Sequence, residues 1–250
     1  MRRTSEISVT DITHLAKFRG YVNQNYFKND STLVVEKNFT EHLLCTKTRY
    51  ADTFWFYQTD AIIGQSLYHY GEYTENELGL LRNFMQPTSV IYDIGANIGV
   101  HSIAFCKGTK HVYAFEPNHN NLKLLKINLS RENNKTILPY AISDSCGTTH
   151  IEQFTLGSLG NYGECKITTE GQECEKYTID YLVDNKKILP PSIVKIDVEG
   201  HENNVFDGMQ KTIKEHLPVI FFEAMYCDNA KIYDQLNGFG YDIYLSLIHI

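Results

Sequence analysis

From residue 75 onward, short apolar runs alternate with longer amphipathic stretches, which is the pattern of strands and helices in an α/β protein. The apolar runs predict strands at residues 90–93, 111–116, 137–142, 193–197, 219–223 and 241–247. The stretches between them predict helices at residues 100–106, 122–129, 201–214 and 230–236. Strands joined by helices make right-handed crossovers, so we expect an α/β fold with a doubly wound, mostly parallel sheet.

The alternation breaks in two regions. Residues 143–180 contain short β-like pieces separated by glycines, which predicts a β-hairpin insertion. The first 70 residues contain strand-like runs at 32–37 and 53–58, and a segment at 12–25 that is either a short helix or an irregular arm. We therefore expect an N-terminal extension, residues 1–70, that packs on a core domain of residues 71–250.

A polar signal marks where the first core helix should begin. Thr74 and Glu77 have the spacing of a capping box, in which the hydroxyl accepts from a backbone N–H three residues on and the glutamate reaches back. The helix should end before Pro87, because the residue ahead of a proline avoids helical geometry.

Composition and charge narrow the class of protein. The 250 residues include 17 tyrosines, 13 phenylalanines and 1 tryptophan, far more aromatic side chains than a disordered chain carries. The formal net charge of -7 argues against a nucleic-acid partner, which needs a basic surface. We find no apolar run long enough for a membrane span and no secretory signal, so we expect a soluble cytoplasmic protein. Six scattered cysteines without a CxxC pair predict reduced, mostly structural thiols.

The turn after the first predicted core strand has the composition of a nucleoside-binding loop. It runs from Asp93 to Gly99, and the glycines at 95 and 99 permit tight curvature close to a ligand. Glu116 ends the next strand. Its spacing from Gly99 in the sequence is close to the roughly 20 residues expected for an acid that binds ribose hydroxyls. Strand, glycine turn, helix, strand and acid therefore make one nucleoside-binding unit.

The same turn favours S-adenosylmethionine over a dinucleotide. Dinucleotide loops of the form G-x-G-x-x-G use a second glycine so that the backbone can approach a pyrophosphate, and Asn97 stands at that position here. The Asp93 carboxylate suits an ammonium group, which S-adenosylmethionine carries. A Rossmann-type NAD(P)-dependent oxidoreductase and a non-catalytic nucleoside-binding module are the alternatives. Asp144, just past the third predicted strand, is a candidate partner for the adenine amino group.

Charged side chains gather after the fourth predicted strand. Side chains alternate along a strand, so Lys195, Asp197 and Glu199 should share one face beside the cofactor turn and act on the acceptor. His201 is a candidate general base, because the pKa of histidine lies near neutrality. Alternatively, Asp197, Glu199 and Glu223 could hold a magnesium or manganese ion that activates an acceptor hydroxyl. We favour the metal-free arrangement.

Three blocks of the sequence resemble the FkbM-type family of S-adenosylmethionine-dependent methyltransferases. They are the turn from Asp93 to Gly99, the segment Phe115-Glu116-Pro117-Asn118, and the segment Lys195-Ile196-Asp197-Val198-Glu199-Gly200-His201-Glu202. The blocks occur in the family's order. The resemblance implies a class I methyltransferase (Rossmann-like) fold, S-adenosylmethionine as cofactor, and methyl transfer to a hydroxyl of a sugar, a glycan or another natural product.

With this resemblance, the candidate site residues fall into two groups. The cofactor-binding group is Asp93, Gly95, Ala96, Asn97, Gly99, Glu116, Pro117 and Asp144. The catalytic group is Lys195, Asp197, Glu199 and His201. A hydroxylated small molecule or a glycan is the expected acceptor.

Overall fold

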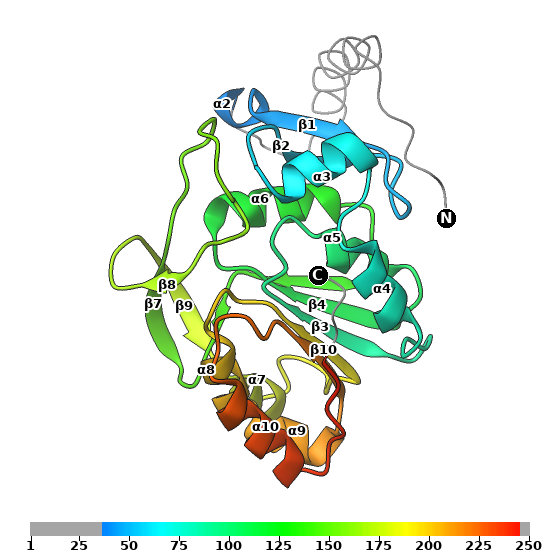
Figure 1. The fold of residues 1–250 in the computed structure, drawn as a ribbon, viewed down its shortest axis with the longest axis vertical. Coiled ribbons are helices and arrows are strands. Elements are labelled where there is room, and N and C mark those ends of the chain that lie inside the picture. Colours follow the sequence, from blue (N-terminus) through cyan, green and yellow to red (C-terminus); the bar gives the residue numbers. More distant parts are fainter. Residues whose placement is uncertain (1–36, 246–250) are drawn as a thin grey trace. The chain divides into compact units, whose positions relative to one another are not determined.

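The structure is a computed structural model and describes residues 37–245 (Figure 1). Its described residues form two compact units. One unit holds the residues up to Tyr73 together with Phe154–Gly163, and the other holds Thr74–Gln153 and the residues from Glu164 onward. The predicted segment at 12–25 and nearly all of the predicted strand at 32–37 lie outside the described residues.

The larger unit is built on a five-stranded parallel sheet whose order is β11-β10-β3-β4-β5. These strands are β3 (Val90–Ile94), β4 (His111–Phe115), β5 (Lys135–Leu138), β10 (Ile193–Ile196) and β11 (Val219–Phe222). The chain runs outward from β3 through β4 to β5, and then returns to place β10 on the other side of β3. This reversal of strand order is the signature of a doubly wound, Rossmann-like fold, and ligands bind at the carboxyl ends of the strands beside it.

Helices cover both faces of this sheet, as Figure 1 shows. Helices α5 and α6 lie on one face, and α7, α8, α9 and α10 lie on the other. The helices of the unit are α4 (Glu75–Arg82), α5 (Val100–Cys106), α6 (His119–Asn128), α7 (Ile179–Asp184), α8 (Glu202–Asp207), α9 (Gln210–His216) and α10 (Asn229–Gly238). Among residues 37–245, no helix has both the length and the apolar content that crossing a membrane requires.

Strand β3 shows how alternation divides the core. Val90, Tyr92 and Ile94 point into a hydrophobic cluster that also holds buried side chains of α7, α8, α9 and α10. Ile91 and Asp93 therefore face the opposite side of the sheet. Every residue of β3 is buried, as expected for a central parallel strand covered by helices on both faces.

The predicted hairpin insertion forms a larger sheet than the two strands of a hairpin. Strands β7 (Gly147–Ile151) and β9 (Gln172–Tyr177) form an antiparallel pair. The short strands β8 (Ile167–Thr168) and β6 (Ala141–Ile142) extend this pair to a four-stranded sheet of order β6-β9-β7-β8. The insertion leaves the main sheet directly after β5 and returns to it through α7.

The smaller unit contains α2 (Lys37–Thr40), β1 (Leu43–Thr46), β2 (Phe54–Tyr57) and α3 (Ile63–Tyr70). Strand β2 confirms the strand predicted at 53–58, and it pairs antiparallel with β1, which was not predicted. The ring of Tyr57 makes edge contacts with Phe154 and Tyr162, and those two rings stack on each other. These aromatic contacts join segments that are about a hundred residues apart in the chain.

Two predictions are wrong: the capping box at Thr74, although helix α4 itself forms, and the strand after residue 240. Thr74 precedes α4 with φ of 54° and makes no capping hydrogen bond, because its hydroxyl lies 3.2 Å from His101 Nε2. Glu77 Oε2 lies 3.3 Å from the same nitrogen, so both members of the supposed capping box meet a buried histidine instead. No strand forms at residues 241–245, the described part of the last predicted strand. Tyr241 and Ile243 pack against the main hydrophobic cluster, which explains their apolar character without strand pairing.

Candidate active site

The turn after β3 has the curvature that its sequence predicts. Gly95, Asn97 and Gly99 have φ values of 79°, 50° and 95°, all in the left-handed region that favours glycine. The N–H groups of Gly95 and Ala96 both donate to the Phe115 carbonyl, at 3.1 and 2.9 Å. A Cβ added at position 95 would lie 1.8 Å from the Asp197 carbonyl oxygen, so only glycine fits there. The cofactor turn therefore touches the turn that follows β10.

Glu116 is held at the end of β4 by two backbone donors. Its Oε2 accepts from Asn97 N–H and its Oε1 accepts from Asn118 N–H, both at 2.8 Å. Burial, which leaves Glu116 6% exposed, raises its pKa to about 7, although these two hydrogen bonds act in the opposite direction. Each carboxylate oxygen has a further lone pair, so the group can still accept from a ligand hydroxyl.

Asn118 connects this acid to the insertion. Its side-chain oxygen accepts from Asn120 N–H and Asn121 N–H and so caps α6. Its side-chain nitrogen donates to the Glu152 carbonyl at 2.9 Å and to Cys165 Sγ at 3.3 Å. This role was not predicted, although an asparagine directly ahead of a helix is a recognisable N-cap signal.

An apolar pocket opens beside Glu116 at the carboxyl ends of β3 and β4. The residues that line it come from both sheet turns and from the insertion: Ile94, Gly95, Phe115, Pro117, Tyr140, Ala141, Ile142, Ile151, Cys165, Ile167, Val198 and His201. Apolar walls beside an acid that can accept from two hydroxyls suit an adenine base with its ribose. The predicted cofactor residues Gly95 and Pro117 belong to this lining.

Asp93 and Lys195 form a buried ion pair on the face of the sheet opposite the main cluster. The parallel register sets Lys195 directly beside Asp93, and Lys195 Nζ lies 3.4 Å from Asp93 Oδ1. Ser102 Oγ donates to Asp93 Oδ2 at 2.5 Å. The two charged residues are 0% and 3% exposed. Asp93 is thus enclosed by protein groups and does not present the exposed carboxylate that a ligand ammonium would need.

Lys195 also links the two turns. Its ammonium donates to the Gly95 carbonyl at 3.1 Å and lies 3.2 Å from Asp197 Oδ2. The nearby Asp197 and Asp93 carboxylates raise the pKa of Lys195 and outweigh its burial. A lysine that stays charged and enclosed cannot accept a proton, and its contacts hold the two turns together.

Three carboxylates converge after β10 and β11. Single oxygens of Asp197, Glu199 and Glu223 all lie within 4.8 Å of one another, and these three residues are called the acid group below. Strand alternation does not produce this convergence, because β10 ends at Ile196 and Glu199 has φ of 56°. The turn is folded by Glu202, whose Oε1 accepts from Val198 N–H at 3.0 Å and Gly200 N–H at 3.3 Å.

Two members of the acid group have a pKa near neutrality. Burial raises the pKa of Glu199 to about 7, with further contributions from Asp197 and Glu223. Burial also raises the pKa of Glu223 to about 7, helped by Asp197 and Glu202. A carboxylate with such a pKa can accept a proton from a hydroxyl at neutral pH, and the group can equally bind sugar hydroxyls or a divalent cation.

His201 lies away from the acid group. Its Nε2 is 3.0 Å from Ser143 Oγ, and its side chain lines the apolar pocket with Val198. Burial lowers the pKa of His201. Among the described residues, the group of converging carboxylates does not include His201.

Asp144 is exposed and shares a hydrogen-bonding partner, the Ser143 hydroxyl, with His201. Its Oδ1 accepts from Ser145 Oγ at 2.8 Å and its Oδ2 accepts from Asn204 Nδ2 at 2.9 Å. These side-chain hydrogen bonds, with the one from Ser143, lower the pKa of Asp144. An exposed, ionised carboxylate can accept from an amino group.

Residues 93–243, more than half of the chain, match the family model described as the methyltransferase FkbM domain. Hexuronic acid methyltransferase AglP of Haloferax volcanii is 34% identical over 143 residues, which cover 56% of this chain and 58% of AglP.

Two solved structures are also similar. Methyltransferase FkbM from Methylobacillus flagellatus KT has 16% identity and a TM-score of 0.48, covering 92% of this chain and 53% of its own. Precorrin-6y C5,15-methyltransferase from Geobacter metallireducens GS-15 has 20% identity and a TM-score of 0.42, and the match covers 69% of this chain and 72% of that protein. The chain spans little more than half the length of AglP and of the Methylobacillus protein.

Proposed function

The chain belongs to the FkbM methyltransferase domain family, and from that premise we propose that it transfers a methyl group from S-adenosylmethionine to a hydroxyl group of a sugar. One observation carries the proposal. The turn beside the nucleoside pocket and the turn that bears the acid group touch at Gly95 and Asp197. The cofactor site and the acceptor site would therefore be adjacent and fixed relative to each other. A nucleophilic displacement between two bound substrates requires this arrangement.

The residues of the pocket fit the nucleoside part of the cofactor. Glu116 would accept from the ribose hydroxyls, the apolar lining would hold the adenine, and Asp144, which shares Ser143 with the lining residue His201, would accept from the adenine amino group. S-adenosylmethionine would supply an electrophilic methyl group and leave as S-adenosylhomocysteine. The chain itself must orient the acceptor hydroxyl and take its proton.

We assign the proton-accepting role to Glu199. Its pKa of about 7 makes the ionised form available at neutral pH, and Asp197 and Glu223 beside it can orient the acceptor through its other hydroxyls. His201, considered for the same role from the sequence, faces Ser143 and the pocket instead. Glu199 would take the proton of the acceptor hydroxyl, and the bound cofactor would supply the methyl group that the acceptor oxygen receives.

The acceptor class is taken from the relative AglP, whose name describes action on a hexuronic acid. The oxidoreductase alternative is disfavoured because Asn97 occupies the second-glycine position and its N–H is already bonded to Glu116. The binding-module alternative does not explain why two half-buried carboxyls with near-neutral pKa values lie in one group.

A direct assay tests the proposal. The protein is incubated with S-adenosylmethionine and a panel of uronic and neutral glycosides, and S-adenosylhomocysteine and methylated sugar are both quantified by mass spectrometry. We expect equal amounts of the two products. Bound cofactor without transfer to any glycoside would contradict the proposed function, and a melting temperature raised by NADPH alone would favour the oxidoreductase.

Replacement of the ribose acid should weaken cofactor binding. Glu116→Gln should lower the affinity for S-adenosylhomocysteine by about 1–3 kcal/mol, because two ribose hydroxyls lose a charged acceptor. Calorimetry on a variant with an unchanged circular dichroism spectrum measures this loss. Glu215→Gln, an exposed acid on α9, is the matched control and should bind as the wild type does. Equal affinity of all three proteins would remove Glu116 from the cofactor site.

Metal dependence gives a second test of the acid group. The convergence of Asp197, Glu199 and Glu223 meets the geometric need of a cation site. Their raised pKa values, however, allow protons to relieve the repulsion between Glu199 and Glu223. We therefore expect activity to survive exhaustive dialysis against a chelator. Loss of activity that magnesium or manganese restores would show instead that a cation activates the hydroxyl.

A further inference from the structure

An exposed aromatic side chain lies against the turn that carries Glu199. A Cβ added at Gly200 would lie 3.3 Å from Tyr226 Cβ, so the two turns are in direct contact. Tyr226 is 53% exposed, and its neighbour Met225 is 66% exposed. Exposed apolar side chains next to converging polar groups are typical of a ligand-binding site.

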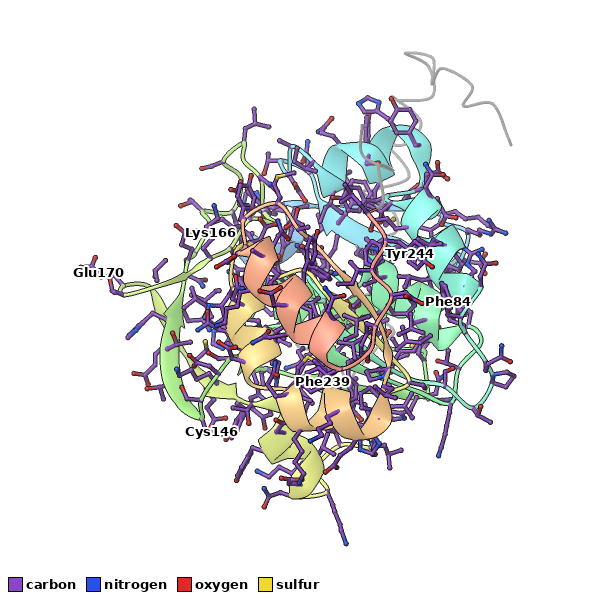
Figure 2. All side chains as sticks on the ribbon, turned by 60° about the horizontal axis from the view of Figure 1, so that its bottom comes forward. Phe84, Cys146, Lys166, Glu170, Phe239 and Tyr244 are labelled. Carbon is purple, nitrogen blue, oxygen red and sulfur yellow. The ribbon has the colours of Figure 1, made fainter. Side chains whose placement is uncertain are left out.

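Lys166 extends over this aromatic ring from the insertion. Its Nζ lies 4.9 Å from the centroid of the Tyr226 ring, a cation–π arrangement. Its backbone is fixed, because its N–H donates to Glu152 Oε2 at 3.2 Å and its carbonyl accepts from Glu152 N–H at 2.9 Å. Figure 2 shows Lys166 beside the segment that leads into α10. The ammonium also donates to Glu164 Oε1 at 2.9 Å.

Charges around Glu199 are mostly negative. Asp197, Glu223 and Glu164 raise the pKa of Glu199, and Lys166 lowers it. Lys195, the other ammonium near the acid group, is enclosed by Asp93, the Gly95 carbonyl and Asp197. An anionic acceptor that approaches the acid group is repelled unless an accessible cation receives its charge.

We propose that Lys166 determines acceptor specificity by binding the carboxylate of an acidic sugar, with Tyr226 beneath the sugar ring. This inference rests on the proposed function. An ammonium forms charge-assisted hydrogen bonds with carboxylates, and the sugar carboxylate takes the position that Glu164 holds in this structure. The ionised group is then held at Lys166, and a hydroxyl of the same ring can reach the acid group. A neutral sugar offers nothing for Lys166 to bind.

The test compares 4-nitrophenyl β-D-glucuronide with 4-nitrophenyl β-D-glucoside. Dissociation constants are measured with S-adenosylhomocysteine bound, and kcat/KM is measured with S-adenosylmethionine. Measured well above the pKa of Glu199, where the base is ionised in both proteins, Lys166→Gln should weaken glucuronide binding and lower kcat/KM for the glucuronide about tenfold, without a comparable change for the glucoside. Lys166→Arg should keep most of the preference. Lys211→Gln is the control, because Lys211 is an exposed lysine on α9 that pairs with Asp184.

The outcomes separate this inference from the proposed function. Equal losses for both glycosides in Lys166→Gln, or no loss for either, would overturn the role of Lys166 while leaving sugar methylation intact. Absence of glucuronide binding to the wild type would overturn it as well. Glucuronide binding that depends on Lys166 without methyl transfer to either glycoside would support the carboxylate site and contradict the methyltransferase assignment.

Discussion

Glu199→Gln is expected to lower kcat at neutral pH by about 10²–10⁴-fold, the usual contribution of a positioned general base. Glutamine keeps the size and the hydrogen-bonding capacity of the side chain, but it cannot accept the proton of the acceptor hydroxyl. Cofactor affinity should be unchanged, because Glu199 is not part of the pocket lining.

The pH dependence of kcat provides an independent test of Glu199 as the general base. A general base acts in its ionised form, and the pKa of Glu199 is raised to about 7. The kcat of the wild type should therefore be low in acid, rise as the pH passes through about 7, and level off above it. Saturating cofactor and acceptor remove the contribution of Glu116, whose pKa is also raised to about 7. The residual rate of Glu199→Gln should lack this rise.

Two further variants identify the base if this assignment is wrong. His201→Ala should retain most of the turnover, since His201 faces Ser143. Collapse of turnover in His201→Ala together with normal turnover in Glu199→Gln would assign the proton transfer to the histidine. Glu215→Gln changes an exposed acid on α9, outside the acid group, and should leave kcat equal to that of the wild type.

Lys195→Ala is expected to destabilise the folded protein by about 3–5 kcal/mol, because it leaves Asp93 buried without its counter-ion. Asp93 is 0% exposed, and the remaining donor to its carboxylate is the uncharged hydroxyl of Ser102. Chemical denaturation followed by circular dichroism measures the free energy of unfolding.

Companion variants separate this effect from the loss of side-chain volume. Asp93→Asn combined with Lys195→Met removes both charges and should recover much of the lost stability. Lys211→Ala removes an exposed partner of Asp184 and should change stability little. An unfolding midpoint of Lys195→Ala equal to that of the wild type would mean that Asp93 does not depend on the lysine.

Most of the sheet could be predicted because its strands are apolar runs bounded by polar turns. Strand β10, for example, was expected at 193–197 and ends at Ile196. The run predicted at 137–142 is the exception, since it is divided between β5, which begins at Lys135, and β6 of the insertion. The glycine turn could be predicted for a similar reason, since left-handed φ values at positions 95 and 99 are easily adopted only by glycine. These features depend on a few neighbouring residues, which a sequence displays directly.

The grouping of the acids was expected, but for a different physical reason. Alternation along β10 would have set Glu199 beside Lys195, whereas a left-handed turn folded by Glu202 brings it to Glu223. Glu202 is fully buried and accepts from the N–H groups of the turn that precedes its own helix. No local pattern distinguishes such a glutamate from an exposed one in a first helical turn.

Long-range contacts account for the other differences. Thr74 and Glu77 have the spacing of a capping box, yet they meet His101, which lies more than twenty residues further along the chain. Similarly, the apolar residues at 241 and 243 pack against the main hydrophobic cluster rather than pairing with a strand. In both cases tertiary packing overrides a local preference, which sequence patterns cannot show.

The contact between Gly95 and the Asp197 carbonyl limits where new specificities can evolve. A side chain at position 95 has no room, and a shift of either turn would displace both the cofactor turn and the acid group. Substitutions should therefore be tolerated best in two other segments near the acid group. These are the loop that contains Met225 and Tyr226, and the residues just before β8 that include Lys166. Directed evolution toward other acceptors should randomise these two segments and leave both turns unchanged.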